Sequence, residues 1–183
     1  NKFKVKCNGF SQENFEKLIS LNRKIALDSN ASFTEKDCIW LQENPNSEKL
    51  LYIEQPLDIG NFKVLEKNKF ANWMADEDAQ NVEILEKLVP HYKSVNIKLM
   101  KCGGLTPALE FIKKAKKLDF KIMLGCMTES SVGISAACAL AGLLDYADLD
   151  GANLISNDYA KGSVVENGKI MVSEKPGLGI SIF

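Results

Sequence analysis

The sequence predicts an α/β protein of the TIM-type (β/α) barrel class, incomplete here, with about seven strand–helix units. Short apolar segments of strand length alternate with amphipathic helical segments, which is typical of parallel βαβ architecture. The strand segments end in a lysine or an acid at steps of 22, 26, 22, 22 and 50 residues, and the last step spans two units. A phosphate-binding glycine loop, expected after the first strand of an open doubly wound sheet, is absent. The strand-end residues are Lys6, Asp28, Glu54, Asp76, Lys98 and Asp148, with Cys126 at the intermediate position.

The first half of the chain supplies four of these units. Residues 3–6 alternate apolar and polar, so Lys4 and Lys6 are expected on one face of a short strand. Ser11 is expected to cap the first helix and Thr34 the second, because both residues accept hydrogen bonds from free N–H groups at a helix start. The next strands, each ending in acidic residues, are expected at 25–28, 50–56 and 73–77.

The second half continues the pattern, beginning with a helix that Asp78 is expected to cap. An apolar strand then delivers Lys98 at its end, followed by a glycine pair. Thr106 is a candidate N-cap and Pro107 stands where the first helical residue is expected, for a helix reaching about residue 118. The remaining elements are a strand at 121–125, a helix at 133–141, a strand at 146–150 and a hairpin with an Asn-Gly turn at 164–172.

A closed barrel needs eight strands, and the sequence supplies seven. We expect the eighth strand and its helix to precede Asn1, so that this chain is part of a barrel. Residues 1–160 are expected to form the partial barrel that carries the catalytic strand ends, and residues 161–183 a C-terminal hairpin and tail.

Composition narrows the function classes. A net charge of -1 argues against nucleic acid or an anionic membrane as the main partner. No apolar run approaches the roughly 20 residues that a membrane span needs. Five cysteines without a C-x-x-C pair suit reduced thiols, so we expect a cytoplasmic protein. The single histidine, His91, excludes a multi-histidine metal site and leaves acid–base chemistry to lysines and carboxylates.

The predicted strand ends place charged groups that suit proton transfer. Asp28, Glu54 and Asp76 would lie at one level on consecutive strands, where they repel each other unless a cation lies between them. Oxygen ligands alone favour Mg²⁺ over zinc. Lys6 and Lys98 flank this triad and are candidates to remove a proton from one face of a carbon and return it to the other, through an enediolate that the metal stabilises.

These residues form an ordered set of motifs that resembles the enolase superfamily, in its muconate-lactonizing subgroup. The resemblance implies Mg²⁺ at the three carboxylates and an acid–base role for the two strand-end lysines. Asn30 and Glu77 are expected to support the metal ligands, and Lys4 to hold the substrate carboxylate or to lower the pKa of Lys6. The motifs are Lys4-x-Lys6, Asp28-x-Asn30, Glu54-Gln55-Pro56, Asp76-Glu77, and Lys98 followed by Gly103-Gly104.

Within that subgroup the chain is most similar to the dipeptide epimerases. Asp148-x-Asp150 looks like the pair that binds the free α-ammonium group of a dipeptide substrate in that family. Residues 97–106 and 125–131 also look like the family, and Glu129 is a candidate either for substrate contact or for supporting a residue that makes it. The implied reaction is epimerisation of the C-terminal residue of an L-Ala-Glu-type dipeptide, as in murein peptide recycling.

The resemblance also sets out what this chain lacks and which alternatives stay open. The family carries an N-terminal α+β capping domain that closes the site, and the C-terminal tail would return toward it. We expect the missing part in the same or a separate chain, no activity from these 183 residues alone, and possible homo-oligomers. The alternatives are N-acylamino acid racemisation, o-succinylbenzoate synthesis or cycloisomerisation, or an inactive barrel fragment. The Asp148-x-Asp150 pair favours the epimerase, because substrates without an amine do not need it.

Overall fold

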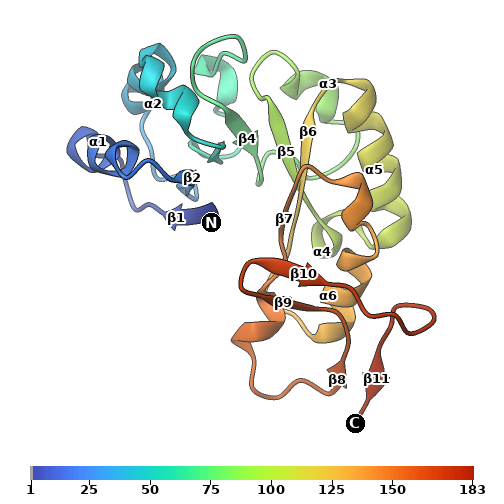
Figure 1. Cartoon of the computed structure of the whole chain (residues 1–183). Coiled ribbons are helices and arrows are strands. Elements are labelled where there is room, and N and C mark those ends of the chain that lie inside the picture. The colour runs from blue at the N-terminus through green and yellow to red at the C-terminus, as the bar shows by residue number, and fades with distance from the viewer. Residues whose placement is uncertain (1) are drawn as a thin grey trace. The chain divides into compact units, whose positions relative to one another are not determined.

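A computed structural model describes residues 2–183 of the chain. Its main sheet has seven strands whose spatial order, β1-β2-β3-β4-β5-β6-β7, is their order in the chain (Figure 1). Parallel strands in chain order, with helical segments between them, are the topology of a (β/α) barrel, so the predicted incomplete barrel is confirmed. The strands are β1 (Lys2–Lys6), β2 (Lys24–Asp28), β3 (Ile53–Glu54), β4 (Trp73–Ala75), β5 (Ser94–Lys98), β6 (Lys121–Gly125) and β7 (Tyr146–Asp148).

The chain divides into two compact units, and the division falls inside β5. The first unit ends at Val95 and takes in Leu118–Phe120. The second consists of Asn96–Lys117 and Lys121–Phe183. Residues 2–183 contain no helix that is long and apolar enough to cross a lipid bilayer.

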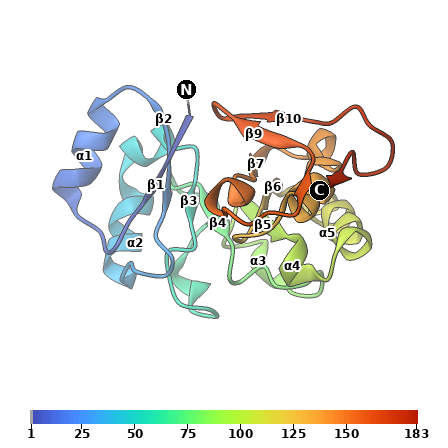
Figure 2. The ribbon, with the colours of Figure 1, turned by 90° about the horizontal axis from the view of Figure 1, so that it is seen from below.

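Local sequence signals explain the first two helices, α1 (Gln12–Ser20) and α2 (Glu35–Glu43). Ser11 accepts a hydrogen bond from a first-turn backbone N–H, and Thr34 forms a complete capping box with Asp37. Both predicted caps are therefore confirmed. The two helices lie on the same side of β1 and β2 (Figure 2).

The helices pack through an aromatic cluster. The Phe15 ring of α1 lies edge-on to the Trp40 ring of α2, with 5.4 Å between ring centroids. Phe10 contacts both rings, and Phe33 contacts Phe10. Residues 25–28 of β2 are all buried, as expected for a parallel strand covered on both faces. The core of the first unit thus fixes the strand ends on which the candidate site stands.

The third helix, α3 (Leu85–Leu88), is a single turn and does not begin at Asp78. The predicted capping role of Asp78 is wrong, because its buried carboxylate accepts hydrogen bonds from Gly60, Tyr92 and Gln55 instead. The rest of the first unit's helical structure consists of short 3-10 segments at Pro45–Lys49 and Phe62–Val64.

Strand lengths also differ from the prediction. β3 stops after Glu54 because Gln55 has a φ of +36°, in the left-handed region that ends an extended segment. β4 and β7 stop at Ala75 and Asp148, each two residues before its predicted end.

The second unit contains α4 (Leu99–Cys102), α5 (Leu105–Lys117) and α6 (Ser131–Cys138), with 3-10 segments at Ala141–Leu143 and Gly151–Leu154. α5 begins at Leu105, so Thr106 lies inside the helix and is not its N-cap. Pro107 is tolerated there because first-turn N–H groups have no partner within the helix. Gly103, with a φ of +98°, ends the one-turn helix α4.

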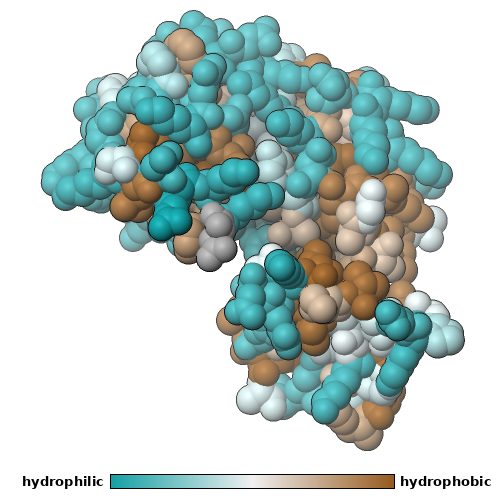
Figure 3. Space-filling model, in the orientation of Figure 1, coloured by the Kyte–Doolittle hydropathy of each residue, from teal (hydrophilic) through white to brown (hydrophobic). Residues whose placement is uncertain are grey.

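The C-terminal region of the second unit forms two antiparallel strand pairs. β9 (Val164–Glu166) and β10 (Lys169–Met171) are joined by Asn167 and Gly168, both with positive φ, which confirms the predicted Asn-Gly hairpin. β8 (Ala160–Lys161) pairs with β11 (Ser181–Ile182). Apolar surface is exposed at β10, as Figure 3 shows.

Candidate active site

The strand register of the first unit brings three predicted site residues side by side. Lys6 pairs with Asp28 across β1 and β2, and Asp28 pairs with Glu54 across β2 and β3. Asp76 follows the end of β4, whose residue Met74 pairs with Glu54. Asp28, Glu54 and Asp76 are only 2%, 1% and 2% exposed, so three carboxylates are buried at neighbouring strand ends.

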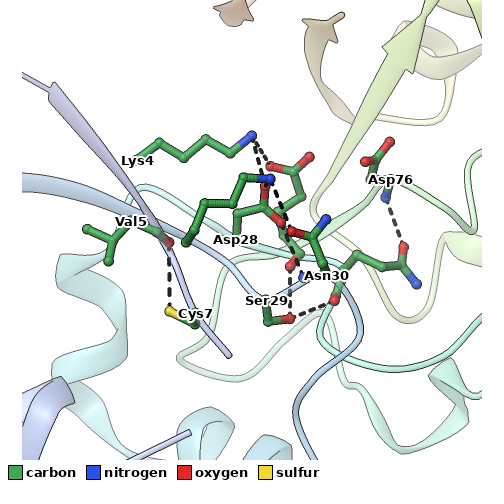
Figure 4. Close-up of polar contacts among 10 residues, drawn as sticks. Lys4, Val5, Cys7, Asp28, Ser29, Asn30 and Asp76 are labelled. Carbon is green, nitrogen blue, oxygen red and sulfur yellow. Dashed lines mark hydrogen bonds and ion pairs between the residues drawn. The ribbon is translucent and has the colours of Figure 1, made fainter. Parts of the chain in front are cut away.

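Two lysines supply the positive charge that these carboxylates require. The Lys4 Nζ lies 3.2 Å from Asp28 Oδ2 and 2.8 Å from Glu54 Oε2, so its ammonium group bridges two strands (Figure 4). The Lys6 Nζ lies 2.7 Å from Asp28 Oδ2 and donates to Asn30 Oδ1 at 3.0 Å. The Lys6 side chain is mostly exposed and that of Lys4 mostly buried. Lys6 is therefore the more accessible lysine of this pair.

The two paired carboxylates differ in acidity. Burial raises the pKa of Glu54 to about 7; the charges of Asp28 and Asp76 act in the same direction, and Lys4 opposes them. Burial also acts to raise the pKa of Asp28, but hydrogen bonds and charges from Lys6 and Lys4 outweigh it and lower this pKa. Asp28 is thus ionised at neutral pH, while Glu54 is poised between its two forms.

The donor set of this site suits a hard divalent cation. Its candidate ligands are carboxylate oxygens only, which Mg²⁺ prefers over the nitrogen and sulfur donors of zinc sites. The Lys4 ammonium group lies between two of the carboxylates, which shows that these carboxylates bind a positive charge. As the side chains stand, no three His, Cys, Asp or Glu side chains within residues 2–183 are gathered closely enough to form a metal-binding group.

The residues predicted to support the ligands lie beside them. The Asn30 backbone N–H donates to Asp28 Oδ1 at 3.3 Å, and the Asn30 side chain accepts from Lys6. Glu77 follows Asp76 and is half-buried, and its Oε2 has no hydrogen-bond partner among the residues that the structure describes. Asn30 thus links a lysine to a carboxylate.

Sequence reasoning missed two residues at these strand ends. The Ser29 hydroxyl contacts the backbone carbonyls of Glu54 and Gln55, at 3.2 and 2.7 Å. Gln55 is completely buried and bonds to the backbone after β4. The position of Gln55 inside the Glu-Gln-Pro motif was the available signal, whereas nothing in the sequence distinguished Ser29.

The other predicted residues lie in the second unit. Lys98 and Asp148 are the last residues of β5 and β7, and both are half-buried. Asp150 is exposed. The Glu129 carboxylate accepts a hydrogen bond from the Met127 backbone N–H at 3.1 Å. All four therefore stand at or just beyond the C-terminal ends of strands.

Comparison with curated proteins gives relatives that are racemases and epimerases by name. An L-Ala-D/L-amino acid epimerase of Maribacter sp. (strain HTCC2170 / KCCM 42371) is 39% identical over 176 residues, which are 90% of this chain and 52% of the relative. An N-acetyl-D-glutamate racemase of Pseudoalteromonas sp is 39% identical over 141 residues, 72% of this chain and 42% of the relative. The chain spans about half the length of the curated relatives it matches.

The solved structures that this chain resembles include enzymes of the same kind. A dipeptide epimerase from Methylococcus capsulatus, complexed with Mg and the dipeptide L-Arg-D-Lys, has a TM-score of 0.87 at 31% identity, covering 100% of this chain and 56% of that one. Muconate lactonizing enzyme, at 22% identity, shares the fold with a TM-score of 0.83 and covers 99% of this chain and 55% of that one. A family model described as "Enolase C-terminal domain-like" matches residues 3–183. The predicted family is confirmed: the chain belongs to the enolase C-terminal domain-like family.

Proposed function

We propose that this chain carries the catalytic strand ends of a Mg²⁺-dependent dipeptide epimerase. The reaction is a 1,1-proton transfer at the α-carbon of the C-terminal residue of an L-Ala-Glu-type dipeptide. The observation that carries the proposal is the row of three buried carboxylates at neighbouring strand ends, flanked by Lys4 and Lys6. The relative named as an L-Ala-D/L-amino acid epimerase supports the same reaction.

The carboxylates of Asp28, Glu54 and Asp76 would hold the cation. When bound, Mg²⁺ supplies positive charge that stabilises the developing enediolate of the substrate. Lys4, whose ammonium lies between Asp28 and Glu54, is the candidate contact for the substrate carboxylate. Asn30 holds Lys6 in place through its side-chain oxygen.

Lys6 and Lys98 would exchange the roles of base and acid. One lysine removes the α-proton from one face of the carbon, and the other returns a proton to the opposite face. Exposure of the Lys6 side chain leaves its amine accessible to a substrate. Each lysine would serve one epimer as base and the other as acid, which is why a reversible epimerase needs both.

The second unit would recognise the substrate amine. Asp148 ends β7 and Asp150 follows two residues later, as in the Asp-x-Asp pair, and two carboxylates suit a free α-ammonium group. Glu129 is a further candidate for substrate contact. The proposal extends to murein peptide recycling in the cytoplasm, which follows from L-Ala-Glu as the substrate.

The N-acetyl-D-glutamate racemase among the relatives favours a second candidate, racemisation of N-acylamino acids. Such substrates carry no free ammonium group, so the Asp148-x-Asp150 pair counts against them.

A screen for α-proton exchange in D₂O with Mg²⁺, run on the protein completed with the expected N-terminal part, tests the proposal. We expect NMR to detect exchange with L-Ala-L-Glu and related L,L-dipeptides, and little with N-acetylated glutamate. Asp150→Asn should weaken use of the dipeptide about 10-fold or more, because a hydrogen bond to a charged group contributes about 1.5–3 kcal/mol. The matched control, Asp119→Asn in the loop after α5, should behave as the wild type. Exchange with N-acyl amino acids alone would refute the epimerase assignment.

A further inference from the structure

Gln55 connects the ends of β3 and β4 through every polar atom of its side chain. Its Oε1 accepts from the backbone N–H groups of Asp76 and Asp78, at 3.0 and 3.1 Å. Its Nε2 donates to the Leu57 carbonyl at 2.8 Å and to Asp78 Oδ2 at 2.9 Å. An amide can accept two bonds and donate two, so the hydrogen-bonding capacity of Gln55 is fully used.

Asp78 fixes the other end of this connection. Its Oδ2 also accepts from the Tyr92 hydroxyl at 2.7 Å, and its Oδ1 accepts from the Gly60 backbone N–H at 2.8 Å. Asp78, Tyr92 and Gln55 are 4%, 0% and 0% exposed. Burying a carboxylate costs free energy unless hydrogen bonds satisfy it, and three bonds do so for Asp78. Here they join the loop after β3, the loop after β4 and the segment before β5.

The backbone at Gln55 is itself in an unfavourable conformation. A φ of +36° is uncommon for a residue with a side chain, and such strain persists only where surrounding contacts impose it. The conformation turns the chain immediately after Glu54, so that the next side chain reaches across to the backbone of Asp76. Such strain fits a site in which the Glu54 and Asp76 carboxylates must be held in fixed directions.

We infer that Gln55, anchored by Asp78 and Tyr92, is a positioning residue that sets the separation of the Glu54 and Asp76 carboxylates for a divalent cation. The inference rests on the proposed function. Gln55 follows one candidate ligand in the chain and is hydrogen-bonded to the backbone of the next, so its amide sets the spacing between them. Mg²⁺ demands near-ideal octahedral geometry, which makes that spacing important.

Calorimetric titration of the purified protein with Mn²⁺ tests this inference without an activity assay. Gln55→Met removes all four hydrogen bonds while keeping the length of the side chain. We expect the Mn²⁺ dissociation constant to rise about 10- to 100-fold, as for other residues that orient metal ligands.

Gln42→Met is the matched control. Gln42 is also buried, and its amide also ties two backbone groups, donating to the Val64 carbonyl and accepting from the Glu66 N–H. It lies in α2, away from the carboxylates. Its replacement should lower the melting temperature of the metal-free protein as Gln55→Met does, but should leave the Mn²⁺ dissociation constant unchanged.

The possible outcomes separate the inference from the proposed function. Equal Mn²⁺ affinities for both glutamine variants and the wild type would overturn the positioning role and leave the proposed function standing. A wild-type protein that binds no Mn²⁺ would overturn the proposed function, and the inference with it. If Gln55→Met does not fold, Tyr92→Phe removes one bond from Asp78 and should still weaken Mn²⁺ binding about threefold; unchanged affinity would contradict the inference.

Discussion

The strand ends of the first unit and those of the second unit differ in burial and in connection. In the first unit, the carboxylates of Asp28, Glu54 and Asp76 are buried, and lysines bind the first two of them. In the second unit, Asp148 is half-buried and Asp150 is exposed. Burial of like charges is costly and persists where a rigid charged site is needed, whereas exposed carboxylates suit a ligand that arrives and leaves. The difference matches a division between cation binding and substrate recognition.

Removing one buried carboxylate should have the largest effect. Asp76→Asn keeps the size of the side chain but removes one negative charge from the cation site. We expect loss of detectable Mn²⁺ binding. In the protein completed with the expected N-terminal part, we expect α-proton exchange to fall about 10³-fold or more, since each 1.36 kcal/mol of lost transition-state stabilisation is tenfold in rate. Asp145→Asn, in the loop before β7, is the control and should bind Mn²⁺ normally. If Asp76→Asn bound Mn²⁺ as tightly as the wild type, the assignment of cation binding to the first unit would be wrong.

A smaller effect should appear in the stability of the metal-free protein. Burial raises the pKa of Glu54 to about 7 from an ordinary value of 4.5, so the folded state retains a proton that the unfolded state has lost. The contribution of Glu54 to stability is therefore complete below about pH 4.5 and disappears as pH rises through 7. We expect the free energy of unfolding in EDTA to fall by about 3 kcal/mol from this group between pH 4.5 and 8.

The Glu54→Gln variant isolates this effect, because glutamine does not titrate. Its unfolding free energy, measured by urea denaturation, should lack the decrease that the wild type shows over this pH range. Asp28 does not obscure the comparison, because its pKa is lowered and its contribution is lost only in more acidic solution. If the unfolding free energies of the two proteins changed with pH in the same way, the pKa of Glu54 would not be raised as described.

The sequence was most informative where a pattern repeats. Apolar segments predicted all seven strands, and the spacing of the charged strand ends predicted their parallel arrangement, because βαβ units place equivalent residues at equivalent levels. Capping motifs at Ser11 and Thr34 were read correctly because they depend only on residues three positions apart. The Asn-Gly hairpin was predictable for the same reason.

Tertiary contacts decided what the sequence could not show. Asp78 resembles a helix cap locally, but Gln55 from the loop after β3 and Tyr92 from the segment before β5 donate to its carboxylate. The Gln55 and Ser29 contacts likewise join segments more than 20 residues apart. The position of Lys4 between two carboxylates depends on strand register, which alternation alone does not determine.

One measurement tests the central claim most directly, because it requires a lysine from each unit. Lys6→Ala and Lys98→Ala are each introduced into the protein completed with the expected N-terminal part. Each variant is incubated in D₂O with Mg²⁺ and with each epimer of the dipeptide, and α-proton exchange is followed by NMR. The two-lysine scheme predicts that each variant loses exchange from one epimer about 10²- to 10⁴-fold, and that the two variants lose opposite epimers. Equal retention of exchange from both epimers in either variant would contradict it.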